Sequence, residues 1–256
     1  MKITLLGTGT SQGVPVIGCQ CDVCVSDNPH DNRLRSSVLL SHGDWNILID
    51  AGPDFRQQML RANVRHLDAI FLTHEHNDHV IGMDDIRPFN HRSGKSMSVY
   101  ALPRVAQDVR RRFEYVFKDP LPGLPRIDLI PIELGVNHVF GDLIVQPIGV
   151  MHGKLPIVGF RMGEMAYLTD VKTVEAEEIA KLFGIKFLIV NALHHEPHPT
   201  HMNLSEALAF EAALGPQQTW FTHISHHMGL ANVVGPLLPP HVSLAFDGQQ
   251  IEFQHQ

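Results

Sequence analysis

The stretch LTHEHNDHV, residues 72–80, contains the pattern H-x-H-x-D-H, whose four named side chains are potential metal ligands. His74 and His76 are two residues apart, so at the end of an extended strand their side chains leave the same face. Asp78 and His79 follow where the chain turns and can point to a neighbouring position. Because this H-x-H-x-D-H pattern directly follows the apolar run AIFLT (69–73), it predicts a metal site at a strand end.

The composition is that of a globular protein. The chain has 256 residues, of which 44% are hydrophobic and 18% charged, and no linker divides it. We therefore expect one domain spanning residues 1–256. A formal net charge of -7 disfavours a broad surface for nucleic acid. The apolar run at the N-terminus is too short for a signal peptide or a membrane span, which predicts a cytoplasmic protein.

Short apolar, β-branched runs predict strands along the whole chain. These strands are expected at 2–6, 37–41, 46–50, 69–73, 98–102, 143–150, 157–162, 166–170, 187–192, 219–224, 243–248 and 251–253. Helices are expected at 53–64, 103–117, 172–184 and 203–215, and a hairpin turn at 42–45. Several strands precede the first helix, and helices then alternate with strands. This order favours an α/β fold of the four-layer αββα sandwich type over a doubly wound parallel sheet.

The motif resembles the signature of the metallo-β-lactamase superfamily, whose fold is that αββα sandwich. Members of this superfamily carry further ligands after later strands, and the chain offers candidates in the same order. These are His152 in GVMHGK, Asp170 in AYLTD and His223 in WFTHIS. The resemblance implies two divalent ions, with Asp170 bridging both. It places one ion on His74, His76 and His152, and the other on Asp78, His79 and His223.

A binuclear site of this kind predicts a hydrolase. Two divalent ions can share a hydroxide and also neutralise oxygens during displacement at phosphorus, so a metal-bridging hydroxide attacking a phosphodiester is the expected reaction. Zinc, manganese and iron(II) all suit these ligands. Asp78 is a catalytic candidate because it is a ligand at this reacting centre. Asp170 stands where antibiotic-hydrolysing relatives commonly have Cys, which argues against β-lactam cleavage.

All three cysteines lie in GCQCDVC (18–24), as Cys19, Cys21 and Cys24. In a reducing compartment such a cluster favours metal over disulfides, but a closed zinc site takes four ligands. C-x-C-x2-C together with THISH near the C-terminus closely resembles the cyclic-phosphate phosphodiesterases of the carbon-phosphorus lyase pathway. That resemblance implies a separate structural zinc, with His226 as its fourth ligand. Free thiols and a redox switch are the alternatives.

A histidine before the last predicted helix is the candidate proton donor. In the phosphodiesterases that the chain resembles, a His in a similar context contacts the phosphate or protonates the leaving oxygen. His201 in HPTHMNLSEAL (198–208) fits this context. His194, His195 and His198 are alternatives in the same stretch.

The expected partner is a small phosphate-ester substrate, with no membrane partner and a nucleic-acid partner disfavoured. The sequence leaves open whether the chain forms a homodimer. Arg33 and Arg35 could bind substrate phosphate or simply be solvated. The alternative functions are ribonuclease Z-like RNA 3′-end processing, thioester or lactone hydrolysis, and a non-catalytic metal-binding module. The resemblance weakens between Asp84 and Pro125, a segment expected near the mouth of the site.

Overall fold

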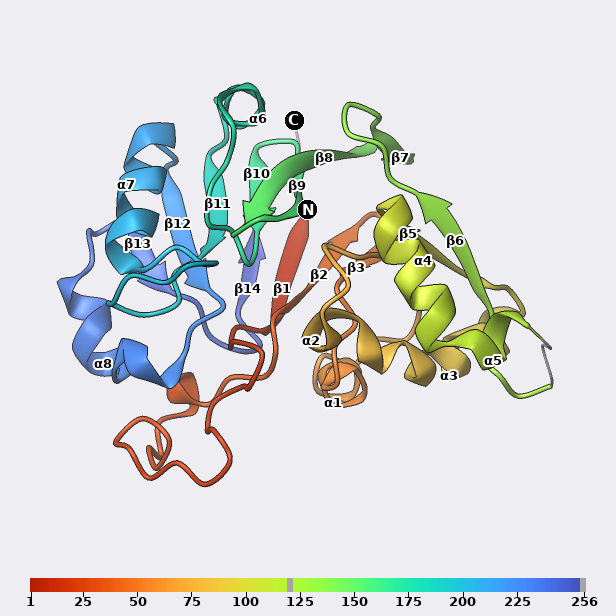
Figure 1. Ribbon diagram of the computed structural model, residues 1–256, viewed down its shortest axis with the longest axis horizontal. Coiled ribbons are helices and arrows are strands. Elements are labelled where there is room, and N and C mark those ends of the chain that lie inside the picture. Colours follow the sequence, from red (N-terminus) through yellow and green to blue (C-terminus); the bar gives the residue numbers. More distant parts are fainter. Residues whose placement is uncertain (119–121, 254–256) are drawn as a thin grey trace.

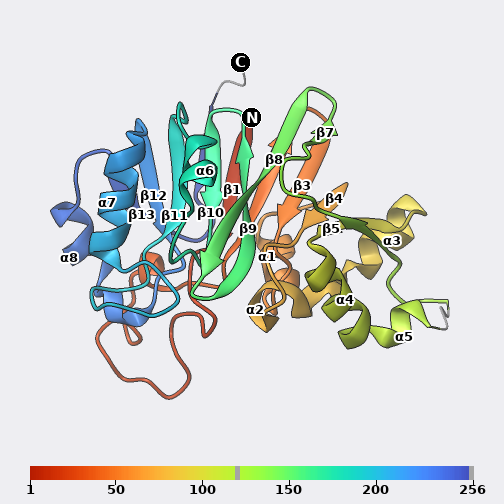
Figure 2. The same cartoon turned by 45° about the horizontal axis from the view of Figure 1, so that its top comes forward.

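Two seven-stranded sheets lie face to face, and helices cover the outer side of each (Figures 1 and 2). This computed structural model describes residues 1–118 and 122–253. The strand order is β14-β1-β2-β3-β4-β5-β6 in the first sheet and β13-β12-β11-β10-β9-β8-β7 in the second. The four-layer αββα sandwich expected from the order of elements is therefore confirmed.

The strands of the first sheet are β1 (Lys2–Gly7), β2 (Ser37–His42), β3 (Trp45–Ile49), β4 (Ala69–Phe71), β5 (Met97–Ala101), β6 (Ile127–Pro131) and β14 (Gln250–Glu252). Those of the second are β7 (His138–Phe140), β8 (Leu143–His152), β9 (Leu155–Met162), β10 (Met165–Leu168), β11 (Phe187–Asn191), β12 (Gln218–Thr222) and β13 (Val242–Leu244).

The helices beside the first sheet are α1 (Phe55–Arg61), α2 (Asn77–Val80), α3 (Arg87–Ser93), α4 (Pro103–Arg112) and α5 (Glu114–Phe117). Those beside the second are α6 (Ala176–Ala180), α7 (Leu204–Leu214) and α8 (Ala231–Val234). Short 3-10 turns are η1 (Pro29–Asp31), η2 (Ile81–Ile86), η3 (His226–Met228) and η4 (Gly235–Leu237). Among the described residues no helix combines the length and apolar character that crossing a membrane requires.

Each sheet is antiparallel in one part and parallel in the other. In the first sheet β1, β2 and β3 pair antiparallel, and β3 to β6 pair parallel. In the second, β7 to β10 pair antiparallel, and β10 to β13 pair parallel. Ligands usually bind outside the carboxyl ends of parallel strands. Both sheets therefore offer such ends for a site.

Three apolar clusters hold the layers together. The cluster between the sheets includes Phe71, Phe160 and Tyr167, all fully buried. A second packs α1 to α5 onto the first sheet, and a third packs α6 to α8 onto the second. Burying the strands on both faces explains their near-continuous apolar runs.

All twelve expected strands are present, with small differences at their ends. The edge strands β6 and β7 were missed, as were α2, α3 and α8. The helix expected at 103–117 is divided at Phe113 into α4 and α5, and that expected at 172–184 is reduced to α6. The expected turn at 42–45 joins β2 to β3, with Gly43 in the left-handed region at φ 55°.

Candidate metal centre

The residues of the H-x-H-x-D-H motif lie just beyond the end of β4, where the chain turns into the four-residue helix α2. His74 is fully buried and His76 is exposed. His152 ends β8, Asp170 follows β10 by two residues, and His223 directly follows β12. Strand ends from both sheets therefore supply the side chains of the site.

Three histidines form the first potential metal site. Ring nitrogens of His74, His76 and His152 all lie within 4.8 Å of one another. The Nε2 of His74 is 3.0 Å from the Nδ1 of His76. The Nδ1 of His152 lies 2.9 Å from the carbonyl oxygen of Thr200, which fixes the orientation of that ring. The Nε2 of His152 is then the nitrogen left for an ion.

Asp78, His79 and His223 form the second potential site, again with their ligand atoms within 4.8 Å. The Nε2 of His79 is 3.2 Å from Oδ2 of Asp78. Both His79 and His223 are almost completely buried. Burial of two imidazoles beside a carboxylate is expensive unless a cation or hydrogen bonds compensate for it.

Asp170 lies between the two sites. Its Oδ2 is 3.3 Å from Nε2 of His79, and its Oδ1 is 3.1 Å from Nε2 of His223. The same carboxylate also groups with His74 on one side and with His152 on the other. One buried carboxylate thus contacts or neighbours members of both sites.

Three strand ends reach the site through left-handed backbone. Asp50, Asp170 and His223 have φ values of 65°, 59° and 54°. This conformation costs about 1–2 kcal/mol for a residue with a side chain, and such residues cluster at functional sites. We therefore attribute the unfavourable backbone conformation of these three residues to the positions that their side chains take in the site.

Asp50 belongs to the site and was missed by the sequence analysis. Its Oδ1 accepts a hydrogen bond of 2.8 Å from the backbone N–H of Thr73, and its Oδ2 accepts one from the Thr73 hydroxyl. Oδ2 also lies 2.7 Å from the Nδ1 of His79. Asp50 therefore orients His79 from behind, leaving the Nε2 of that ring free. An acidic residue ending the apolar run NILID (46–50) was the available signal.

The donor set fits divalent ions. The Nε2 of His79 and both ring nitrogens of His223 are buried and make no hydrogen bond of good geometry among the described residues, although carboxylate oxygens lie 3.1–3.3 Å from the two Nε2 atoms. Burial acts to lower the pKa of His79, but Asp50, Asp170 and Asp78 raise it well above its usual range. The three carboxylates thus favour positive charge at this position. Unpartnered buried nitrogens in an acidic environment are what a metal ion would satisfy.

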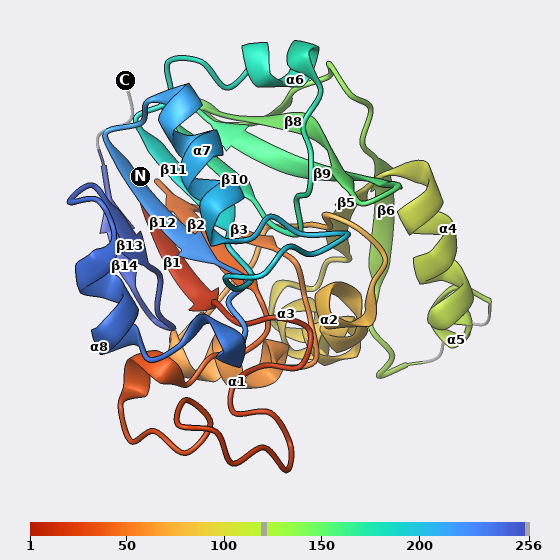
Figure 3. The same ribbon diagram turned by 60° about the vertical axis from the view of Figure 1, so that its left-hand side comes forward.

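The three cysteines converge on His226. The Sγ atoms of Cys19, Cys21 and Cys24 lie 3.4, 3.3 and 3.5 Å from its Nδ1. In a tetrahedral zinc site, bond lengths of about 2.3 Å to sulfur and about 2.0 Å to nitrogen separate the two atoms by about 3.5 Å. The observed spacing fits such a site. Figures 1 and 3 show the cysteine-bearing loop after β1, in red, beyond the sheets and beside α8.

The pKa values of the thiols also favour a cation bound among them. The hydrogen bond with His226 lowers the pKa of Cys21 to about 6. Burial raises the pKa of Cys24 to about 11. Three clustered thiols therefore cannot all become thiolates at neutral pH without a cation among them.

His201 lies beside Asp170, with its Nε2 3.1 Å from Oδ1 of that carboxylate. Burial lowers the pKa of His201 to about 4, so the metal-free imidazole is neutral at pH 7. His198 contacts it, with the two Nδ1 atoms 3.1 Å apart. His194 is nearby, whereas the Nε2 of His195 lies 2.9 Å from the carbonyl oxygen of Met228. Among the four candidates, His201 is the one in contact with Asp170.

A cavity of about 230 Å³ opens beside these residues. It is lined by Thr10, Ser11, Gln12, Leu193, His194, His198, His201, His223, Ser225, His226 and His227. Hydroxyl, amide and imidazole groups thus dominate its wall, and the described lining contains no carboxylate. Such a wall offers hydrogen-bond donors to an anionic ligand.

Arg33 and Arg35 are held by protein groups. Arg33 is buried and donates to the hydroxyl of Thr8 and to the carbonyl oxygen of Ala245. Arg35 pairs with Asp54 at 3.2 Å. Arg33 thus holds the loop after β1 against the segment after β13, and Arg35 holds Asp54 before α1; binding of substrate phosphate by either arginine stays a prediction.

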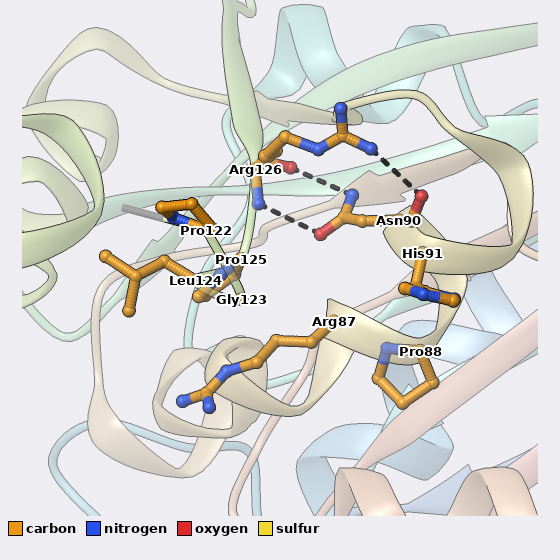
Figure 4. A pocket seen from close by; sticks show the side chains of 9 residues that line it. All are labelled: Arg87, Pro88, Asn90, His91, Pro122, Gly123, Leu124, Pro125 and Arg126. Carbon is orange, nitrogen blue, oxygen red and sulfur yellow. Dashed lines mark hydrogen bonds between the residues drawn. The ribbon is translucent and has the colours of Figure 1, made fainter. Parts of the chain in front are cut away.

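A larger cavity, of about 570 Å³, lies elsewhere and is lined by none of the candidate metal ligands or candidate proton donors (Figure 4). Its wall combines the arginines and prolines of two segments, 87–91 and 122–126. The side chain of Arg126 is bonded to the carbonyl oxygen of Asn90. Its lining includes one side chain that commonly binds metals, the imidazole of His91, so the larger cavity is not the one with the metal-binding chemistry. The chemistry locates the candidate site at the smaller cavity.

Comparisons with known proteins bear on the family and the fold. A family model described as a β-lactamase superfamily domain matches residues 45–224. The solved structure of a diphosphatase from the PhnP family is 36% identical, with a TM-score of 0.93, and the match covers 99% of this chain and 98% of that one. Zn²⁺-bound PqqB from Methylobacterium extorquens is 21% identical, with a TM-score of 0.79 and coverage of 99% and 100%, and is similar in fold.

Among curated proteins, an octanoyltransferase from Porphyromonas gingivalis is 43% identical over 252 residues. The match covers 97% of this chain but 51% of that protein. The chain spans about half the length of the first curated relatives that it matches.

Proposed function

The chain belongs to the β-lactamase superfamily, with the metallo-β-lactamase fold, and from that premise we propose that it is a metal-dependent phosphodiesterase acting on small phosphate esters, cyclic phosphates included. The position of Asp170 carries the proposal. Its oxygens lie 3.3 Å from His79 and 3.1 Å from His223, which belong to one ligand set, and the carboxylate also groups within 4.8 Å with His74 and with His152 of the other set. A carboxylate so placed can serve two cations at once. The similarity to a PhnP-family diphosphatase over nearly the whole chain favours phosphorus as the reacting centre.

The ligand sets follow from the two clusters. His74, His76 and His152 would hold one divalent ion, and Asp78, His79 and His223 the other, with Asp170 shared. Zinc, manganese and iron(II) suit these mixed imidazole and carboxylate donors. When bound, two such ions would supply Lewis-acid activation of water and of the phosphoryl oxygens.

The chain's own residues would orient the metal ligands and bind the substrate. Asp50 and the carbonyl of Thr200 fix the rings of His79 and His152, so that Nε2 of each points inward. The cavity beside His201 receives the ester. His201, whose ring is neutral at pH 7, would donate a hydrogen bond from its N–H to the leaving oxygen, because an alkoxide leaves poorly when its developing charge is unsupported.

A third ion has a structural role in this proposal. Zinc on Cys19, Cys21, Cys24 and His226 leaves no position open for substrate. Because His226 lies three residues after His223, the zinc would also fix the segment that carries a ligand of the reactive site.

The test is hydrolysis of bis(4-nitrophenyl) phosphate by protein loaded with manganese or zinc, compared with Asp170→Asn. We expect turnover by the loaded protein and a loss of at least about 100-fold in the variant, since removal of a shared ligand disturbs both ions. The zinc content of the cysteine site should stay the same in both. Equal rates for the two proteins would contradict the proposal.

A substrate panel separates this proposal from the alternatives. It contains a 2′,3′-cyclic nucleotide, a nucleoside diphosphate, pre-tRNA, a lactone and an octanoyl thioester. The thioester is included because the relative from P. gingivalis is named an octanoyltransferase, although this chain covers only 51% of it. Faster turnover of the thioester than of every phosphate ester would replace phosphodiester hydrolysis by acyl hydrolysis.

A further inference from the structure

The two residues of the H-x-H-x-D-H motif that are not ligand candidates are Glu75 and Asn77, and each is held by an arginine of the same helix. Arg104 at the start of α4 donates to Oε1 of Glu75. Arg112 at the end of α4 donates to Oδ1 of Asn77. The two arginines are eight residues apart, which is about 12 Å along a helix. The ligand-bearing loop therefore lies along α4 and is attached at two points.

Backbone hydrogen bonds hold both ends of this loop: the N–H of Val158 donates to the carbonyl oxygen of Thr73, and the N–H of Ala51 donates to that of His79. The strand β4 ends at Phe71, and α2 has only four residues, with no side-chain hydrogen bond at its N-cap residue His76. Such a short helix is not stable through its own backbone. Between the two anchored ends, side-chain contacts help to set where His74 and His76 lie.

Arg104 also reaches the other sheet. Its second guanidinium nitrogen donates to the carbonyl oxygen of Pro156 at 2.6 Å. Pro156 belongs to β9 and pairs in register with Met151, the neighbour of His152 on β8. One guanidinium thus joins the loop that carries His74 and His76 to the hairpin that carries His152.

Glu75 depends on this contact. Its second carboxylate oxygen is buried and has no hydrogen-bond partner in the described part of the chain. Without Arg104, an unpaired carboxylate would lie between two ligand candidates, and its burial would be unfavourable.

We infer that Arg104 is a positioning residue that sets the spacing of His74, His76 and His152 through Glu75 and Pro156, and that Arg112 anchors the Asp78 end of the loop through Asn77. The inference rests on the ligand sets of the proposed function. It assigns α4 the task of holding the ligand loop at the correct distance from the opposite sheet.

The test measures metal affinity rather than turnover. Competition with a chromophoric chelator gives the affinity of each ion, and the visible absorption of bound cobalt(II) reports its coordination geometry. For Arg104→Met we expect about 10–100-fold weaker binding of one ion, as is usual when the outer partner of a ligand is lost. The other reactive-site ion and the cysteine-bound zinc should keep their affinities within about threefold of the original protein.

Two further variants separate positioning from general stability. Arg111→Met is the matched control, because Arg111 lies on the same helix, is exposed and pairs only with Asp108 among the described residues. Arg104→Lys keeps one charge but cannot bridge Glu75 and Pro156 with a planar fork, so intermediate weakening is expected. In a protein that already carries Glu75→Gln, Arg104→Met should weaken metal binding less than it does in the original protein.

The inference is overturned if Arg104→Met leaves both affinities and the cobalt spectrum unchanged, or weakens all three ions equally as the protein unfolds. It is also overturned if Glu75→Gln does not reduce the effect. A protein that hydrolyses no phosphate ester but shows the expected change in affinity would disprove the proposed function and leave this inference standing.

Discussion

The Nδ1 of His226 lies 3.3 Å from the Sγ of Cys21, although 205 residues separate them in the sequence. The contact joins the loop after β1 to the segment after β12, which also carries His223. It therefore links the proposed structural zinc directly to a ligand of the reactive site.

Cys21→Ser should remove this zinc. Elemental analysis should find about three metals per chain in the original protein and about two in the variant. The thermal midpoint should fall as well, because zinc affinity in such sites is comparable to the stability of a whole domain. The matched control is His227→Ala, an exposed neighbour that lies outside the Cys3His set. An unchanged metal count in Cys21→Ser would argue for free thiols.

Asp50→Asn should weaken metal binding while the fold is retained. Asn has nearly the same size and tolerates the left-handed conformation at φ 65°, but it cannot hold the Nδ1 of His79 with a charged oxygen. We expect about 10–100-fold lower affinity for one ion. Chelator competition measures this, and circular dichroism checks the fold. An affinity equal to that of the original protein would mean that His79 does not depend on Asp50 for its orientation.

His201→Ala should affect poor leaving groups most. One hydrogen-bond donor to a developing oxyanion is typically worth about 10²–10³ in rate, and it matters far less for a nitrophenolate, whose charge is already delocalised. We therefore expect a much larger loss of kcat on a methyl phosphodiester than on bis(4-nitrophenyl) phosphate. Equal losses on both substrates would assign His201 to binding alone. His195→Ala is the control, because its Nε2 lies against the carbonyl of Met228.

The three tyrosines of the chain should lose their phenolic protons only at unusually high pH. Burial raises the pKa of Tyr100 and, far more, that of Tyr167. Burial and the hydrogen bond to Asp84 raise the pKa of Tyr115 to about 12. Because the folded pKa values exceed the unfolded value of about 10, the resulting stability is complete below pH 10 and is lost as the pH rises through them.

The absorbance of tyrosinate at 295 nm measures this titration. We expect no ionisation step near pH 10 in the folded protein, and a rise at higher pH that coincides with unfolding followed by circular dichroism. Asp84→Asn should lower the pKa of Tyr115, because a neutral partner repels the phenolate less. A tyrosine that ionises at about pH 10 in the folded original protein would contradict this prediction.

The sequence predicted the interior of the fold better than its edges. Strands such as β4 and β11 are buried on both faces, so their apolar runs are evident without a structure. By contrast, β6 ends in Pro131 and carries the exposed Asp128, and β7 has three residues. Both are edge strands, for which a continuous apolar run is not required.

In the candidate site, too, the sequence revealed some residues and not others. The motif residues, His152, Asp170 and His223 follow apolar runs, and the structure brings them together. Asp50 acts through His79, and Arg104 acts through Glu75, so neither belongs to a pattern of ligands. The contacts of Arg33 with Thr8 and Ala245, and of Arg35 with Asp54, were not evident from the sequence, because these partners lie far from the arginines along the chain.

The long span between the cysteines and His226 has a consequence for biosynthesis. At about 5–20 residues per second, a ribosome needs about 10–40 s to make the 205 residues that separate Cys21 from its partner. During that interval the thiols have no imidazole to complete a tetrahedron. His223 is also translated after the other proposed ligands of its own ion, so that ion and the structural zinc would reach full coordination nearly together, once residues 223–226 have been made.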